Sequence, residues 1–203
     1  MRRRTGPATE RTSQMVATRA VSVTVEELWD LCHEPYRFAL IDGELHRMPG
    51  AGGTHGALKM FLAMHLGPFV YSRSLGKLYG DTGFRLFPDR ETTLFPDVAF
   101  VRADRVPSAV EEERFLNLVP DLAMEIESPT DYPKLKDEKV AAYLDARTPC
   151  LLWLYPRTRS ISVYRPGQVA VKLGPDDVLD GGDILPGFSI RVADLFAAPH
   201  ADR

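Results

Sequence analysis

Cysteine and long apolar runs are both scarce in this sequence. Cysteine occurs only twice in 203 residues, at Cys32 and Cys150, and the two positions lack the close spacing of a metal-binding pair. So few cysteines are typical of a reducing compartment, and we expect a cytoplasmic protein in which both thiols are buried. The longest uninterrupted apolar run, from Cys150 to Tyr155, is far too short to cross a bilayer, so no membrane association is expected.

An excess of positive charge is also missing. The chain has 25 Lys and Arg against 28 Asp and Glu, a formal net charge of -3 at pH 7, so no overall attraction to nucleic acid is expected. A hydrophobic content of 44% and a charged content of 26% are those of an ordinary globular protein. We expect a disordered tail over residues 1–20, a single domain over residues 21–197 and a short tail over residues 198–203.

Local signals predict an α/β fold with a mixed sheet flanked by helices. Thr24 and Glu27 have the spacing of a capping box, which predicts the start of a short helix. Asp42-Gly43 lies between two strand-like runs and predicts a hairpin with a type I′ turn over residues 38–48. Thr54 is predicted to cap a longer helix, because apolar residues follow it at helical spacing. These apolar positions are Leu58, Phe61, Leu62, Leu66 and Phe69.

Two strand-like segments, each beginning with Pro-Asp, contain most of the candidate site residues. The first covers Pro96 to Val101, and the second covers Pro120 to Pro129. Because strand side chains alternate between faces, Glu125 and Glu127 share one face of the second segment, about 7 Å apart. Like charges repel, and a buried carboxylate without a partner is costly, so a metal ion, a lysine or solvent is expected beside them.

A helix predicted over residues 134–146 carries one lysine on its apolar side. On a helical wheel at about 100° per residue, Lys139 falls between Leu135 and Tyr143, near the middle of the apolar stripe. A lysine in such a position commonly covers apolar surface with its stem while its amine reaches solvent. The alternative is an amine that faces the carboxylates of the preceding strand.

Asp97, Glu125 and Glu127 together suggest a site for a divalent metal ion. Neighbouring strands lie about 5 Å apart, so carboxylates from the two Pro-Asp segments could converge. Oxygen donors without a Cys/His cluster favour Mg²⁺ or Mn²⁺ over Zn²⁺. Such an ion supplies what phosphodiester hydrolysis requires, an activated water and a neutralised leaving oxygen, and Lys139 could position that water. The alternative interpretation is a solvated acidic sheet face without a function.

A glycine-rich segment before the longer helix is a weaker signal. Gly50, Gly52 and Gly56 form GxGxxxG, which is one residue off the dinucleotide-binding pattern, and no lysine follows as in a P-loop. Its backbone N–H groups could bind a small anion, although a flexible connection is the simpler interpretation. His55, on the inward side of that helix, is interpreted as a core histidine rather than a ligand.

Several short motifs also occur in a recognisable order along the chain. They are Leu40 to Leu45 around Asp42-Gly43, His55 at a helix start, Pro96 to Val101, Pro120 to Glu125 with Ser128-Pro129, and Leu185 to Phe188. From about residue 22 to 196, this series resembles the Uma-two family of restriction-endonuclease-like proteins, within the PD-(D/E)XK nuclease superfamily. The resemblance implies a restriction-endonuclease-like core and a metal-dependent nuclease.

The resemblance also implies roles for individual residues. Asp97 matches the metal-binding Asp of the family, and Glu125 matches the acidic position of the (D/E)XK element. Glu127 stands where the family has a lysine, and Lys139 on the following helix is the candidate for that role. Glu44 matches the additional N-terminal acid of the superfamily.

The leading hypothesis is therefore a DNA endonuclease that uses Mg²⁺ or Mn²⁺. Asp97, Glu125 and Glu127 would hold the metal, Lys139 would assist the water, and Glu44 would be auxiliary. A homodimer would be the simplest assembly for cutting two strands. The alternatives are a catalytically silent member that binds nucleic acid or a protein partner, and a protein that binds a small anion at the glycine-rich segment.

Overall fold

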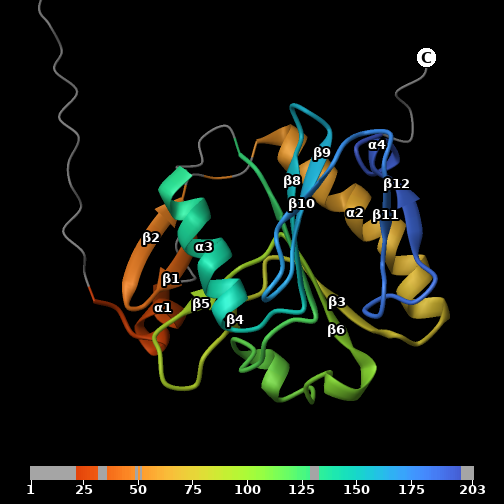
Figure 1. The fold of residues 1–203 in the computed structure, drawn as a ribbon. Helices are drawn as coiled ribbons and strands as arrows, with labels where there is room; N and C mark the ends of the chain where they lie inside the picture. The colour runs from red at the N-terminus through yellow and green to blue at the C-terminus, as the bar shows by residue number, and fades with distance from the viewer. Residues whose placement is uncertain (1–21, 32–35, 49, 51, 129–132, 198–203) are drawn as a thin grey trace, which may run out of the picture.

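A six-stranded mixed sheet forms the centre of the fold (Figure 1). The computed structural model describes residues 22–31, 36–48, 50, 52–128 and 133–197. The predicted tails, Cys32 and Pro129 lie outside this part of the chain. In spatial order the strands are β10 (Val171–Leu173), β9 (Ser160–Tyr164), β8 (Cys150–Tyr155), β7 (Leu122–Ile126), β6 (Val98–Arg102) and β3 (Gly76–Tyr79).

One pair of neighbouring strands in this sheet is parallel. β7 and β8 run in the same direction, and the chain between them forms helix α3 (Pro133–Asp145), whereas the other neighbours are antiparallel. Parallel neighbours require such a crossover connection. The predicted mixed sheet flanked by helices is therefore confirmed, and so is the α/β class.

The two faces of the sheet are covered by different helices (Figure 1). On one face, Leu122, Met124 and Ile126 of β7 belong to the same buried cluster as residues of α2 (Gly53–Ser72). On the other face, Ala123 of β7 belongs to a buried cluster that includes Tyr143 of α3. This division of β7 follows the period-two alternation predicted from the sequence.

A second, four-stranded sheet contains the predicted hairpin. Its strands, in spatial order, are β2 (Glu44–Met48), β1 (Arg37–Ile41), β5 (Thr93–Leu94) and β4 (Phe84–Arg85). Asp42 and Gly43 connect β1 to β2 with φ angles of 49° and 80°. Two consecutive positive φ angles are what a type I′ turn requires, so this part of the prediction is confirmed.

The helix starts agree with the sequence in one case and differ in another. The side chain of Thr24 accepts a hydrogen bond from the Glu27 N–H, and the Glu27 side chain accepts one from the Thr24 N–H, which confirms the capping box before α1 (Val25–Leu31). The prediction that Thr54 caps α2 is wrong, because α2 begins at Gly53 and its N-cap is Gly52. Glycine is accepted at an N-cap, so the threonine hydroxyl was a misleading signal.

The remaining elements are short. They are the 3₁₀ helices η1 (Ala103–Arg105) and η2 (Glu111–Glu113), the two-stranded sheet of β11 (Val178–Asp180) and β12 (Ser189–Arg191), and helix α4 (Val192–Leu195). Cys150, at the start of β8, is buried as predicted. Within the described residues, every helix is too short or too polar to cross a membrane.

Candidate active site

Two buried carboxyl groups face each other on adjacent strands. Asp97 lies immediately before β6, and Glu125 lies in β7. The antiparallel register pairs Val98 with Met124, so the next pair outward is Asp97 with Glu125. Only 1% of Asp97 and 3% of Glu125 is exposed to solvent. The structure thus brings together the two acidic residues that the sequence selected from separate segments.

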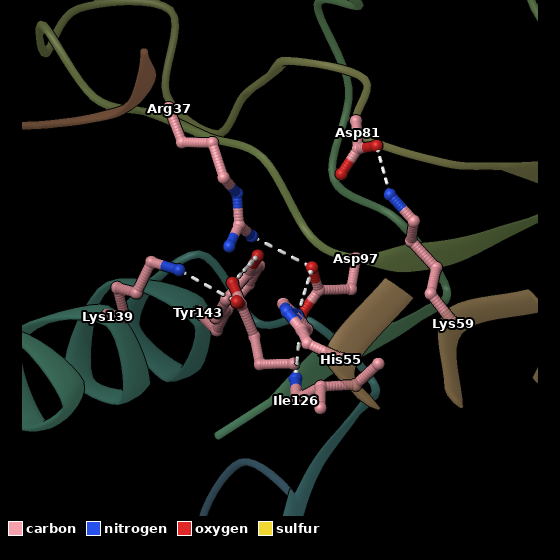
Figure 2. Close-up of polar contacts among 9 residues, drawn as sticks. Arg37, His55, Lys59, Asp81, Asp97, Ile126, Lys139 and Tyr143 are labelled. Atoms are coloured by element: carbon pink, nitrogen blue, oxygen red, sulfur yellow. Dashed lines mark hydrogen bonds and ion pairs between the residues drawn. The ribbon is translucent and has the colours of Figure 1, made fainter. Parts of the chain in front are cut away.

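Asp97 is held by groups from three different elements (Figure 2). Arg37 of β1 donates from Nη2 to Oδ1 over 2.8 Å, and the backbone N–H of Ile126 donates to Oδ2 over 2.8 Å. Nε2 of His55, in the first turn of α2, lies 3.0 Å from Oδ1. Burial raises the pKa of Asp97 above its ordinary value, while Arg37, the Ile126 N–H and Lys139 oppose the rise and Asp81 adds to it.

Glu125 is held from one side by helix α3. Lys139 donates from Nζ to Oε2 over 2.7 Å, and the Tyr143 hydroxyl donates to Oε1 over 3.0 Å. These two residues are four positions apart and therefore share a helix face (Figure 2). Burial raises the pKa of Glu125, Lys139 opposes this rise, and the negative charge of Asp97 adds to it. Burial and Glu125 also raise the pKa of Tyr143, which keeps its hydroxyl protonated as a donor.

Lys139 occupies the position that the helical wheel predicted. Its side chain is only 6% exposed, and its amine points at Glu125 rather than at solvent. The simpler interpretation of an inward lysine, a stem that covers apolar surface below a solvated amine, therefore does not describe this residue. Its catalytic role stays a prediction.

Glu127 lies just beyond the end of β7 and is half-buried. Its backbone N–H donates to the carbonyl of Leu154 over 2.9 Å. Its charge acts on Lys136, which donates to the Tyr155 hydroxyl over 2.6 Å. The alternation of strand residues predicts that Glu125 and Glu127 lie on the same face. In the structure, however, the contacts of Glu127 lie toward β8.

Glu44 lies at the far end of the hairpin from the paired carboxylates. It is the first residue of β2 and pairs with Ile41, whereas Arg37 pairs with Met48 at the other end. The two ends of the hairpin are four residues apart along β1, a distance of about 14 Å. The Glu44 side chain is 49% exposed, and its Oε1 lies 4.0 Å from Nε2 of His46. The structure therefore does not bring Glu44 to the Asp97–Glu125 pair.

Three residues at the site were missed by the sequence reasoning. Arg37 precedes the buried Phe38 in β1, and neighbouring strand residues point to opposite faces. This alternation alone could have predicted that Arg37 points away from the face on which Phe38 lies. Tyr143 was assigned only to the apolar stripe, although its four-residue spacing from Lys139 was visible. His55 was correctly expected to be buried, but the contact with Asp97 joins residues far apart in sequence and has no local signal.

A surface hollow adjoins the site on the side of Asp97. It has a volume of about 390 Å³ and is lined by Tyr36, Arg37, Phe38, Gly50, Lys59, Asp81 and Phe95. Lys59 of α2 forms an ion pair with Asp81 at its edge (Figure 2). A separate cavity, of about 30 Å³, is lined mainly by apolar side chains between the sheet and the C-terminal elements, and we assign it to core packing.

The donor chemistry of the paired carboxylates fits a hard divalent cation. Mg²⁺ is commonly held by one or two carboxylates, while water and substrate phosphate complete its shell. Asp97 and Glu125 supply two carboxylates, whose charges are balanced by Arg37 and Lys139. Within the described ranges, no three His, Cys, Asp or Glu side chains are grouped so that they could hold a metal ion together. A cation here would therefore depend on the two carboxylates.

Comparison with solved structures places this architecture in a known class. The chain is similar to a protein from Anabaena variabilis described as "a putative nuclease belonging to DUF820". The two are 20% identical with a TM-score of 0.71, and the match covers 86% of this chain and 97% of that chain. At this identity the likeness shows a shared fold, and the fold class is that of nuclease-like α/β proteins. No curated protein matches the chain.

The sequence itself identifies the family. The model of the Uma2 family, described as "Putative restriction endonuclease", matches residues 25–193. Since the match covers most of the chain, the chain belongs to the Uma2 family, and the predicted resemblance is confirmed. The family description supports a nuclease as the general class of activity.

Proposed function

We propose that this protein is a metal-dependent endonuclease that hydrolyses phosphodiester bonds in DNA. The observation that supports this most directly is that Asp97, one residue before β6, lies close enough to Glu125 of β7 for their charges to interact, with the Lys139 amine 2.7 Å from Glu125. Two buried carboxylates beside a buried lysine cost solvation energy, and such arrangements are concentrated at functional sites. Family membership independently supports a nuclease.

Asp97 and Glu125 are the residues that would hold Mg²⁺ or Mn²⁺. Glu127, which the sequence also predicts as a ligand, lies just beyond the end of β7 with its contacts toward β8, so its part in holding the ion would be secondary. When bound, the ion supplies Lewis-acid stabilisation of phosphate oxygens and lowers the pKa of water. The protein fixes the two carboxylates in advance: the Ile126 N–H holds one oxygen of Asp97, and Tyr143 holds one oxygen of Glu125.

Lys139 and Arg37 carry the positive charges of the site. Each contacts one carboxylate through one N–H donor, and each has further donors that could bind a phosphate oxygen when substrate enters. Lys139 then orients the attacking water and steadies the charge that develops on the phosphate. Arg37 is 27% exposed and reaches from the hollow to Asp97, so it is placed to position the phosphate.

Plasmid nicking tests this proposal with substitutions that preserve shape. Asp97→Asn and Glu125→Gln should each lower cleavage in Mg²⁺ or Mn²⁺ by at least about 100-fold, as expected when a group that stabilises charge in the transition state is lost. Asp121→Asn is the matched control, because Asp121 also follows a proline and is also buried, but contacts Arg102 and Arg105 instead. Equal cleavage by all four proteins would refute the assignment.

A catalytically silent protein that binds nucleic acid or a protein partner is the alternative. Both carboxylates are already paired with cationic side chains, and Glu127 replaces the lysine that the family resemblance predicts at that position. The wild-type protein would then bind DNA without cutting it in either metal. Such binding should weaken as salt rises if phosphate contacts contribute. DNA as the substrate is a part of the proposal that the same experiments examine, and the proposed homodimer is tested separately by the molar mass of the protein in solution.

A further inference from the structure

We propose that the hollow beside Asp97 binds an unpaired nucleotide, so that the protein acts on single-stranded or distorted DNA in preference to regular duplex. This inference rests on the proposed nuclease function, since it names the substrate of the same site. It starts from the position of the hollow. Arg37 both lines the hollow and donates to Asp97 over 2.8 Å, so a ligand in the hollow would be one side chain away from this proposed metal ligand.

The size of the hollow suits one nucleotide. Its volume of about 390 Å³ falls within the range of about 300 to 1,000 Å³ that is usual for small-molecule sites. It also opens at the surface, because Tyr36 at its rim is 43% exposed. A base of a DNA strand bound over this surface could therefore enter the hollow without a conformational change of the protein.

Aromatic side chains form one part of the lining. Tyr36, Phe38 and Phe95 all line the hollow. The Tyr36 ring lies under the guanidinium of Arg47, 3.0 Å from the ring centroid, and the Phe95 ring is held edge-on to Phe115. Aromatic rings stack with any base, and this sequence-tolerant contact is the usual means by which proteins bind unpaired nucleotides.

Two cationic side chains, Arg37 and Lys59, form another part of the lining, and Arg37 contacts Asp97. Lys59 follows His55 by one helical turn on α2, and its partner Asp81 is 54% exposed. Because exposed ion pairs are weak, Lys59 can leave Asp81 for a phosphate at little cost. Arg37 has five N–H donors, of which one contacts Asp97, so it can bind a phosphate at the same time. The phosphate of a nucleotide in the hollow would thus lie between Arg37 and Lys59.

The charge of the whole chain gives no general attraction to DNA, so binding would depend on local contacts. Proteins that bind regular duplex commonly present a basic face that contacts many phosphates. This chain has a net charge of -3, and the hollow supplies two cations, one of them paired with Asp81, together with aromatic rings. A base inside a duplex is stacked and paired, and extruding it costs energy that an already unpaired base does not require.

Fluorescence anisotropy in EDTA tests the inference without turnover. A labelled 12-nucleotide single strand should bind the wild-type protein at least 10-fold more tightly than the same sequence as a duplex. Tyr36→Ala and Lys59→Ala should each weaken single-strand binding at least 5-fold, whereas Tyr36→Phe, which keeps the ring, should bind like wild type. Lys172→Ala, an exposed lysine on edge strand β10, is the charge control and should also bind like wild type.

The outcomes separate this inference from the proposed function. If single strand and duplex bind equally, or if Tyr36→Ala binds like wild type, the hollow is not a nucleotide site, even when the protein cleaves DNA. If single-strand binding depends on Tyr36 and Lys59 but no cleavage occurs in Mg²⁺ or Mn²⁺, the hollow is a nucleotide site and the endonuclease proposal fails. Circular dichroism of each variant establishes that the fold is retained.

Discussion

The amine of Lys139 lies 2.7 Å from Oε2 of Glu125, and both side chains are buried. Glu125 belongs to β7, and Lys139 belongs to α3, the helix that follows β7 in the chain. An ion pair inside the protein therefore connects this strand to the next helix. Such a pair contributes little net stability, because removing two charges from water offsets their attraction. Its presence here is better explained by the chemistry of the site than by stability.

Breaking this pair from one side should destabilise the fold more than removing both charges. Lys139→Met leaves Glu125 buried without its cation, and we expect a loss of about 3–5 kcal/mol in the free energy of unfolding. The double variant Lys139→Met with Glu125→Gln should recover part of that loss. Urea denaturation of wild type, Lys139→Met, Glu125→Gln and the double variant measures the coupling, and strictly additive effects would contradict it. Lys134→Met, an exposed lysine on the same helix, should cost less than about 0.5 kcal/mol.

Glu125 and Glu127 should contribute unequally to metal binding. Titration calorimetry with Mn²⁺ should show at least a 10-fold loss of affinity for Glu125→Gln and a smaller loss for Glu127→Gln. The reason is that Glu125 lies beside Asp97 at the neighbouring strand, whereas Glu127 lies past the strand end toward Lys136. Glu113→Gln, an exposed residue of η2, controls for general loss of negative charge. Equal losses for the first two variants would indicate a site with three carboxylates.

Glu44→Gln should reduce DNA cleavage less than Asp97→Asn does. Glu44 is half-exposed and lies at the end of the hairpin opposite Arg37. In an auxiliary role, its side chain could contact the substrate only at a distance from the paired carboxylates. Cleavage rates at saturating Mg²⁺ give the comparison. A loss as large as that of Asp97→Asn would mean that Glu44 acts at the reacting phosphate.

The ion pair between Asp42 and Arg90 should make stability depend on pH in the acid range. The two carboxylate oxygens of Asp42 accept from Nε and Nη2 of Arg90 over 2.8 and 3.0 Å, and these hydrogen bonds lower the pKa of Asp42. A lowered folded-state pKa means that the stabilisation is present above the unfolded-state pKa, about 3.9 for Asp, and is lost as pH falls through the folded-state value.

Asp42→Asn isolates this effect, because asparagine also tolerates the positive φ angle at that position. Wild type should exceed the variant by less than about 1 kcal/mol in free energy of unfolding at pH 7, since the pair is largely exposed. The difference should approach zero near pH 2. Urea denaturation at several pH values measures it, and a difference that stays constant would rule out the ion pair as its cause.

The thiol of Cys150 should be inert in the folded protein. Burial raises its pKa to about 11, and the thiolate is the reactive form of cysteine. Because the folded-state pKa is raised, the associated stability is present below the ordinary value of 9.0 and is lost as pH rises through about 11. In a Cys32→Ser background, a disulfide reagent at pH 8 should react only after denaturant is added. Rapid reaction of the native protein would contradict the burial.

Local structure was determined by neighbouring residues in the sequence. The capping box of Thr24 and Glu27, the Asp42-Gly43 turn and the alternation of β7 each depend on residues only a few positions apart, so their patterns are readable without a fold. The inward position of Lys139 is of the same kind, because helical periodicity alone separates it from the polar face.

The completed site was decided by tertiary structure. Asp97 and Glu125 become neighbours only through the antiparallel register of β6 and β7, and a shift of one residue would turn one of them to the other face. Arg37 reaches Asp97 from 60 residues away in sequence, and His55 arrives on a helix that packs against the sheet. Sequence periodicity gives the face on which a residue lies, whereas its partner on that face depends on strand order and helix packing.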